Sequence, residues 1–312
     1  MGQNSKIEWT DHTFNPWRGC TKVSPGCANC YAEKLSKRNP KVLGLWGKNG
    51  SRVVAIDQTW RQPLRWNAEA EKASERRRVF CASLADVFEA DATMPRSAIK
   101  AVNAARIRLV DLIARTPMLD WLLLTKRPEN IPPTLARVAK GGSKSPGPGL
   151  ALVEDWIAGT PPANVWLGTS VENQEAAEKR HQALREVPAV VHFWSAEPLI
   201  DEVDAVPLWE QHGKPDWVII GGESGPKSRP CFLEWVRSLA AQCKTSQVAC
   251  FVKQLGAKPQ EYEGGCRPES PTAGCMSVPI QILRLRSKKG GDIEEWPKDL
   301  QVRTFPKVRK SS

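Results

Sequence analysis

The sequence predicts an α/β protein, built as a complete or partial (β/α) barrel. Short apolar runs alternate along the chain with longer stretches of helical periodicity. These runs are apolar at consecutive positions rather than at alternate ones, which is typical of parallel strands covered by helices on both faces. Seven such runs in a chain of 312 residues favour a barrel over a sandwich of two sheets.

The predicted elements follow one another in a regular order. Strands are predicted over residues 13–18, 78–83, 119–125, 164–169, 190–195, 216–221 and 248–253. Helices are predicted between them over 95–114, 174–185 and 232–244. We expect a flexible loop at 141–149 and irregular structure over 256–280, because both stretches are rich in Gly and Pro. The chain is thus predicted to hold a barrel domain over 1–256 and an irregular basic extension over 257–312.

The formal charge of +11 at pH 7 indicates a polyanionic partner. Residues 31–79 hold 12 Lys or Arg against 5 Asp or Glu, and residues 282–312 hold 9 against 4. Nucleic acid is the commonest polyanion that such surfaces bind. No apolar run is long enough to span a bilayer and the first residues are polar, so we expect a cytoplasmic protein without a membrane partner.

Three cysteines, Cys20, Cys27 and Cys30, lie close together near the N-terminus. A structural zinc site closes with four protein ligands, and iron–sulfur clusters are also usually held by four thiolates. Three thiolates alone would leave one metal position open for a substrate or cofactor. The alternative is a zinc site that His12 completes. The cysteines expected in the core are Cys81, Cys231, Cys243 and Cys250.

Polar residues follow the predicted strands, where a (β/α) barrel builds its active site. They include Ser83, Asp86, Thr125, Lys126, Arg127, Ser170, Glu172, Glu197, Gly221, Gly222, Glu223, Lys253 and Gln254. The first strand runs directly into the cysteine segment, so we expect the metal at the same edge. Most of the 13 tryptophans are expected in the core, while Trp9 and Trp17 are candidates to line a pocket or stack on a base.

The cysteine segment, followed by Tyr31-Ala32-Glu33, resembles the cluster loop of radical S-adenosylmethionine enzymes. The whole chain resembles the phage three-cysteine family that is distantly similar to spore photoproduct lyase. The stretches that carry this resemblance are 9–20, 124–128, 167–173, 195–198, 217–225 and 251–254. The cysteine spacing departs from the common radical enzyme motif, because six and two residues separate the cysteines here. The turn Ser24-Pro25-Gly26 within the longer gap is expected to bring Cys20 back to the same cluster.

The resemblance implies a 4Fe-4S cluster held by Cys20, Cys27 and Cys30, with S-adenosyl-L-methionine on the open iron. It also implies a one-electron reductant, cleavage of the sulfonium and abstraction of a substrate hydrogen by the resulting radical. Candidate cofactor-binding residues are Ser83, Thr125, Ser170, Glu172, Gly221, Gly222 and Glu223. Candidate substrate-binding residues are Lys126, Arg127 and Lys253, whose charges suit phosphate or carboxylate.

The resemblance also implies a substrate, which is a modified thymidine in phage DNA. Related phage enzymes convert an amino acid linked through nitrogen to the thymidine 5-methylene into a carbon-linked form, a hypermodification that protects DNA from host restriction. Phage origin would place the protein in the host cytoplasm. Two alternatives remain at this point. One is a radical lyase that repairs a DNA photoproduct, and the other is a zinc-stabilised nucleic-acid-binding protein without enzymatic activity.

Overall fold

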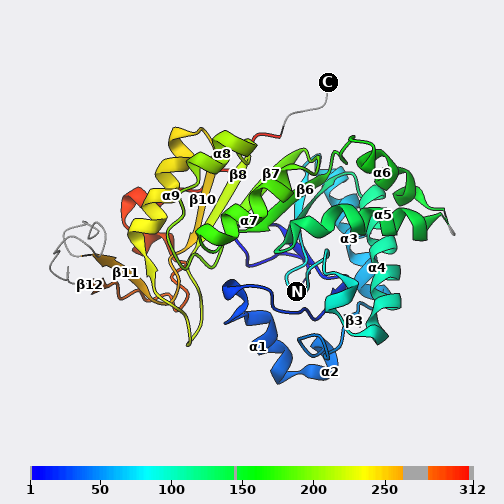
Figure 1. Ribbon diagram of the computed structural model, residues 1–312, viewed down its shortest axis with the longest axis horizontal. Helices are drawn as coiled ribbons and strands as arrows, with labels where there is room; N and C mark the ends of the chain where they lie inside the picture. Colours follow the sequence, from blue (N-terminus) through cyan, green and yellow to red (C-terminus); the bar gives the residue numbers. More distant parts are fainter. Residues whose placement is uncertain (1, 144–145, 263–279, 309–312) are drawn as a thin grey trace. The chain divides into compact units, whose positions relative to one another are not determined.

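The computed structural model describes residues 2–143, 146–262 and 280–308 (Figure 1). The chain divides into two compact units, which we describe separately. The first comprises Met1–Thr169, Gln182–His192 and Val308–Ser312, and the second comprises Ser170–His181 and Phe193–Lys307. In the part of the chain that the structure describes, no helix is both long and apolar enough to cross a membrane.

The first unit is built on parallel strands in the order β1, β4, β5, β6. These strands are β1 (His12–Phe14), β4 (Arg77–Cys81), β5 (Leu119–Thr125) and β6 (Val165–Ser170). Every residue of β1 and β6 is buried, as the continuous apolar runs predict for strands covered on both faces. A short antiparallel ribbon, β2 (Trp17–Arg18) with β3 (Val53–Val54), follows β1 and leads the chain away from the sheet.

Helices follow the strands of the first unit. They are α1 (Tyr31–Arg38), α2 (Pro40–Leu43), α3 (Asp57–Ala73), α4 (Arg96–Ala114), α5 (Ile131–Gly142) and α6 (Pro148–Ile157). The helix α4 contacts both α5 and α6, and Figure 1 shows these three helices side by side. Single 3-10 turns occur at η1 (Pro25–Cys27), η2 (Asp91–Thr93) and η3 (Pro128–Asn130).

The second unit continues the same pattern with three parallel strands. These are β7 (Val191–Ala196), β8 (Trp217–Gly221) and β10 (Ala249–Gln254), and the helices are α7 (Gln174–Arg185), α8 (Val206–His212) and α9 (Leu233–Thr245). A small sheet contains β9 (Cys231–Phe232), β11 (Pro259–Tyr262) and β12 (Ile280–Ile282). Two 3-10 turns, η5 (Ile293–Glu295) and η6 (Lys298–Leu300), precede the last described residues.

The edge of β10 in the second unit is covered by the end of the chain. The Val252 N–H donates to the Val302 carbonyl at 2.8 Å, and the Cys250 N–H donates to the Thr304 hydroxyl at 2.9 Å. The Trp217 indole N–H donates to the Thr304 carbonyl at 2.9 Å. Because an open strand edge invites pairing with another chain, these bonds close a site of unwanted association.

The predicted α/β class is confirmed, and the barrel is a partial one built from seven strands. All the predicted strands occur, although the first is divided into β1 and β2. The buried cysteines Cys81, Cys231, Cys243 and Cys250 are core residues, as expected. The prediction that 256–280 is irregular is wrong for Pro259–Tyr262, which forms β11, while 263–279 lies outside the described residues.

The predicted loop at 141–149 is shorter than expected, because both of its ends are helical. Gly141 and Gly142 belong to α5, and Pro148 and Gly149 begin α6, while 144–145 lies outside the described residues. The glycines serve close packing, because a Cβ at Gly149 would lie 2.4 Å from the backbone nitrogen of Asp111 in α4. Composition alone therefore placed the helix-packing Gly141, Gly142 and Gly149 in the predicted loop.

The expectation that Trp9 and Trp17 line a pocket or stack on a base is wrong. Both are core residues of the first unit, with 2% and 0% of their surface exposed, respectively. The Trp9 ring packs against Phe80 with 4.7 Å between the ring centroids, and the Arg106 guanidinium lies 5.6 Å from the Trp17 ring centroid. Neither indole is free to contact a ligand.

We predict that His12 makes the stability of the fold depend on pH. The ring is buried in β1 and stacks on Trp66 with 4.4 Å between centroids, and burial lowers the pKa of His12 below its ordinary value of 6.5. The unfolded chain therefore binds more protons between the lowered pKa and 6.5, so the free energy of unfolding falls as the pH drops through that range. Urea unfolding at about pH 5.5 and about pH 7.5 measures this loss of unfolding free energy. For a single proton the loss is at most about 1.4 kcal/mol per pH unit.

The matched control is His212→Gln, at a half-buried histidine in α8. We expect His12→Gln to lose the part of the pH dependence that His12 causes, and His212→Gln to keep it. An unchanged pH dependence in His12→Gln would show that the buried ring is not the group responsible.

Candidate functional site

The cysteine segment starts directly after the β2 strand, and local backbone geometry fixes where it begins. The Gly19 N–H donates to the Leu84 carbonyl at 3.0 Å, and Asn15 Oδ1 accepts the Leu84 N–H at 2.7 Å. Gly19 has φ +108, and a Cβ there would lie 2.4 Å from the Ser51 carbonyl oxygen, so only glycine fits. Cys20 is thereby held beside the loop that follows β4.

The three cysteines are partly exposed, and none of them forms a disulfide. Cys27 ends the turn η1, where its sulfur lies 3.9 Å from Ser24 Oγ. Cys30 is the N-cap residue of α1 and makes no side-chain capping hydrogen bond; burial raises the pKa of its thiol, and the backbone N–H groups of Glu33 and Ala32 oppose that shift. Backbone N–H groups at a helix start stabilise a thiolate, so this position suits a metal ligand.

Cys20 lies against a cluster of buried charges. Arg127 Nη1 is 3.8 Å from the Cys20 sulfur and 2.7 Å from Asp86 Oδ2, and Arg127 Nη2 donates to the Thr21 carbonyl. Glu89 lies 3.9 Å from the same guanidinium. Only 4% of the Arg127 side chain is exposed, so the guanidinium is held in place by the protein.

A second buried arginine, Arg52, contacts the same segment. The Arg52 guanidinium binds Glu89 through two hydrogen bonds of 2.7 and 2.8 Å, with both side chains fully buried. Arg52 Nη2 also donates to the Thr21 hydroxyl at 2.9 Å. We call Arg52, Asp86, Glu89 and Arg127 the charge clamp. Its two arginines contact Cys20 and Thr21, and its two carboxylates balance the arginine charges.

Burial favours the protonated form of two of the three thiols, Cys20 and Cys30. Burial raises the pKa of Cys20 to about 12, although the Arg127 guanidinium opposes the shift. Burial also raises the pKa of Cys30, while the two backbone N–H groups and the nearby Lys126 lower it. Since thiolates are the form that binds metal, loading must release protons to solvent.

The other predicted residues of the first unit lie around this segment. The Asn15 side-chain amide donates to the Ser83 hydroxyl oxygen at 3.0 Å. The Tyr31 hydroxyl donates to the Ser83 backbone carbonyl at 2.7 Å. The Thr125 hydroxyl donates to Asp86 Oδ1 at 2.8 Å, so its hydrogen is already bonded within the protein. The Lys126 ammonium is near enough to Cys30 to lower its pKa. Arg127 has its partners within the charge clamp, so its role as a substrate ligand stays a prediction.

The remaining predicted residues belong to the second unit. The Arg180 guanidinium binds Glu172 at 2.6 Å and the Ser170 carbonyl at 2.7 Å, with both carboxylate and guanidinium buried. Glu223 pairs with Arg229 at 2.7 Å and accepts its backbone N–H at 2.8 Å. The carboxylates predicted to hold the cofactor therefore already have cationic partners from their own unit.

Gly221, Gly222 and Lys253 also have contacts within the second unit. A Cβ at Gly222 would lie 2.3 Å from the Leu255 carbonyl oxygen, and one at Gly221 would lie 3.3 Å from the Glu197 side chain. These glycines allow the end of β8 and the residue after it to pack closely against Glu197 and Leu255. The Lys253 ammonium pairs with Glu197 at 2.5 Å. Whether any of these residues touches a ligand stays a prediction.

Sequence reasoning did not assign roles to Asp86, Glu89 and Arg52. Asp86 stands in the loop after β4, where its position beyond a strand end was the only signal. Glu89 is three residues further along and offers no pattern of its own. Arg52 contacts Glu89 across a separation of 37 residues, and only the folded chain brings the two together.

The donor set fits an iron–sulfur cluster with one open iron. Three thiols lie on one short segment, and the cationic and N–H groups beside two of them oppose the rise in pKa that burial causes. Within the described residues, no three His, Cys, Asp or Glu side chains converge closely enough to hold a metal ion, so the three thiols would have to come closer together to hold a cluster. His12 is stacked in the core and accepts the Asn4 N–H at Nδ1, which leaves it unsuited to complete a zinc site.

Comparisons with known proteins give a family and a set of distant structures. A family model described as "Protein of unknown function (DUF5131)" matches residues 4–299. No curated protein matches the chain. A spore photoproduct lyase variant with bound AdoMet and dinucleoside spore photoproduct is 13% identical, with a TM-score of 0.42, covering 81% of this chain and 58% of that one. Spore photoproduct lyase complexed with the dinucleoside spore photoproduct is 13% identical, with a TM-score of 0.39 and coverage of 74% and 58%.

A further variant of the same lyase is 11% identical, with a TM-score of 0.41, and the match covers 91% of this chain and 71% of that one. This chain spans 58% of the length of the first two lyase chains. A likeness of this degree assigns neither an activity nor a substrate.

Proposed function

The chain belongs to the DUF5131 family, and we propose that it is a radical S-adenosylmethionine enzyme that modifies a base in DNA. The observation that carries the proposal is the cysteine segment held by the charge clamp. Cys20, Cys27 and Cys30 would hold a 4Fe-4S cluster. When bound, such a cluster supplies the electron that cleaves S-adenosylmethionine and so starts radical chemistry.

The chain's own residues support this use of the segment. Arg127 places a positive charge 3.8 Å from the Cys20 sulfur, and the backbone N–H groups at the start of α1 lower the pKa of Cys30 against the opposing effect of burial. Both arrangements stabilise the negative charge of a thiolate. The buried ion pairs behind Arg127 keep its guanidinium at that sulfur rather than in solvent.

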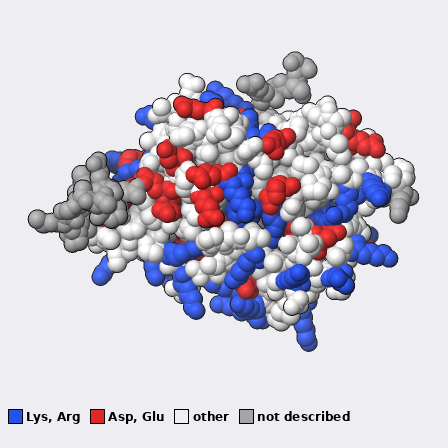
Figure 2. Space-filling view, in the orientation of Figure 1, with Lys and Arg blue, Asp and Glu red and all other residues white. Residues whose placement is uncertain are grey.

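The proposed partner, DNA, is supported by the charge of the chain and its location. The excess of Lys and Arg over residues 31–79 falls in the first unit, which also holds the cysteine segment. Figure 2 shows Lys and Arg side chains gathering over the region of α1 and α2. Exposed basic residues there are Lys37, Arg38, Lys41 and Lys48. Such a surface attracts the phosphates of a nucleic acid and releases their counterions.

The proposed substrate is a thymidine that carries glycine through nitrogen on its 5-methylene, as the sequence resemblance implies. The product carries the same group through carbon. Substrate and product have the same atoms, so the reaction needs no net oxidant, although an external one-electron reductant must start it. A base stacked in a duplex must leave the stack before it reaches the cysteine segment.

The test is anaerobic reconstitution of the purified chain with iron and sulfide, followed by absorbance and electron paramagnetic resonance. We expect about four irons per chain, a brown chromophore and a reduced signal that shifts when S-adenosylmethionine is added. A colourless chain that holds zinc and ignores S-adenosylmethionine would overturn the proposal in favour of a zinc-stabilised nucleic-acid-binding protein.

Product analysis then separates the two radical activities. An isomerase leaves the mass of the modified nucleoside unchanged and shifts its chromatographic retention. A photoproduct lyase instead converts one dinucleoside photoproduct into two thymidines. Turnover of the photoproduct without isomerisation would replace the proposed substrate while leaving the radical chemistry in place.

A further inference from the structure

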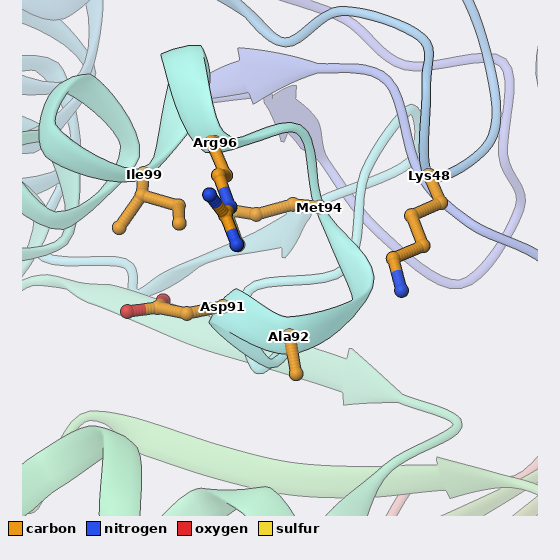
Figure 3. A pocket seen from close by; sticks show the side chains of 6 residues that line it. All are labelled: Lys48, Asp91, Ala92, Met94, Arg96 and Ile99. Atoms are coloured by element: carbon orange, nitrogen blue, oxygen red, sulfur yellow. The ribbon is translucent and has the colours of Figure 1, made fainter.

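A hollow of about 320 Å³ lies in the first unit, apart from the cysteines themselves (Figure 3). It lies between the loop that follows α2, the turn η2 and the start of α4. Figure 3 shows Lys48 and Arg96 on the different segments that line this hollow. The lining residues are Lys48, Asp91, Ala92, Met94, Arg96 and Ile99.

The hollow carries uncompensated positive charge. Its single carboxylate, Asp91, is paired with Arg137 at 2.8 Å and Arg106 at 3.5 Å, neither of which lines the hollow. Across the residues that the structure describes, no ion pair is found for Lys48 or Arg96. Two cations therefore face one space without a negative partner from the protein.

The position of Arg96 adds to this imbalance. Arg96 is the first residue of α4, a helix of 19 residues with no acidic residue in its first turn and no side-chain cap. A cation at a helix start is opposed by the helix dipole. An anion in the hollow would relieve both the dipole and the two side-chain charges at once.

The walls of the hollow are tied to the cysteine segment by hydrogen bonds. The Gly47 N–H, next to Lys48, donates to the Cys20 carbonyl at 2.9 Å. On the other wall, the Thr21 hydroxyl donates to the Thr93 carbonyl at 2.8 Å, next to Met94. The two segments that carry Lys48 and Arg96 are therefore each hydrogen-bonded to the cysteine segment.

We propose that this hollow binds a backbone phosphate of DNA and so anchors the strand beside the cysteine segment. The inference deepens the proposed function and rests on its DNA partner. Two cations that line one hollow from separate segments suit a phosphodiester, whose charge is shared between two free oxygens. Phosphate contacts of this kind fix the position of a strand without reading its sequence.

The test is binding of a fluorescently labelled single-stranded oligonucleotide to the double variant Lys48→Gln with Arg96→Gln. The control is Arg61→Gln with Lys72→Gln, which removes the same charge from exposed positions of α3. Titrations run from about 50 to 200 mM salt, without S-adenosylmethionine or reductant. We expect the hollow variant to weaken binding by about tenfold and to lower the salt slope by about one, with a smaller change in the control.

The result separates this inference from the proposed function, because binding is measured without turnover and with metal content recorded. Equal loss in both double variants would mean that only net charge matters, and it would overturn the phosphate site. Unchanged binding in the hollow variant, with an unchanged melting temperature, would also overturn it. If the purified chain holds no cluster and the hollow variant still loses binding, the phosphate site is supported. The radical chemistry would then have failed in its own reconstitution test.

Discussion

Replacing any one of Cys20, Cys27 or Cys30 by alanine is expected to abolish the iron–sulfur chromophore of the reconstituted protein. An open cluster held by three thiolates has no spare protein ligand, so the loss of one leaves two irons without a protein thiolate. We expect bound iron to fall at least tenfold and DNA modification to disappear with it. The measurements are iron and sulfide content, the visible absorbance and the reduced paramagnetic signal.

Cys81→Ala is the matched control for these variants. Cys81 is fully buried in β4 and belongs to the core rather than to the cysteine segment. This variant is expected to lose some stability through the small cavity it leaves, yet to bind iron as the wild type does. Iron content that survives in Cys27→Ala, or falls equally in Cys81→Ala, would contradict the assignment of the three ligands.

The strands could be predicted because their burial leaves a direct trace in the sequence. A strand covered on both faces, such as Leu119–Thr125, is apolar at nearly every position. The glycines near residue 141 misled because Gly signals both flexible loops and close helix packing, and only the neighbouring helix decides between them. Gly141 packs so near α4 that a Cβ would lie 2.8 Å from Ile107 Cδ1.

The part of the candidate site whose residues lie close together in the sequence could be predicted, and the part built from distant residues could not. Three thiols on one segment can be recognised in the sequence without a structure. The charge clamp cannot, because Arg127 reaches Cys20 across a separation of 107 residues and its carboxylate partners stand in a third segment. The same limit applies to the strand-end carboxylates: Glu172 and Glu223 were expected to face a cofactor, and each is paired with an arginine of its own unit.

Glu89→Gln is expected to destabilise the fold by about 3–5 kcal/mol, because it leaves buried guanidinium charge without its partner. Glu89 is fully buried, holds Arg52 through two hydrogen bonds and lies 3.9 Å from Arg127. The neutral amide keeps the volume and one acceptor oxygen but removes the charge. Domain stabilities are only about 5–15 kcal/mol, so the urea midpoint should fall sharply.

The control for this prediction is Asp299→Asn in the exposed ion pair with Arg237, where the loss should stay below about 1 kcal/mol. The double variant Arg52→Met with Glu89→Met tests the cause, because removing both charges together should cost less than the two single changes added.

The Cys20–Thr21 segment should also loosen in Glu89→Gln, since Arg52 donates to the Thr21 hydroxyl from its place on Glu89. Reconstitution should then yield less iron than in Asp299→Asn. A stability of Glu89→Gln within about 1 kcal/mol of the wild type would mean that water or a neighbouring group compensates the guanidinium charge, and that the clamp does not hold the segment as its distances imply.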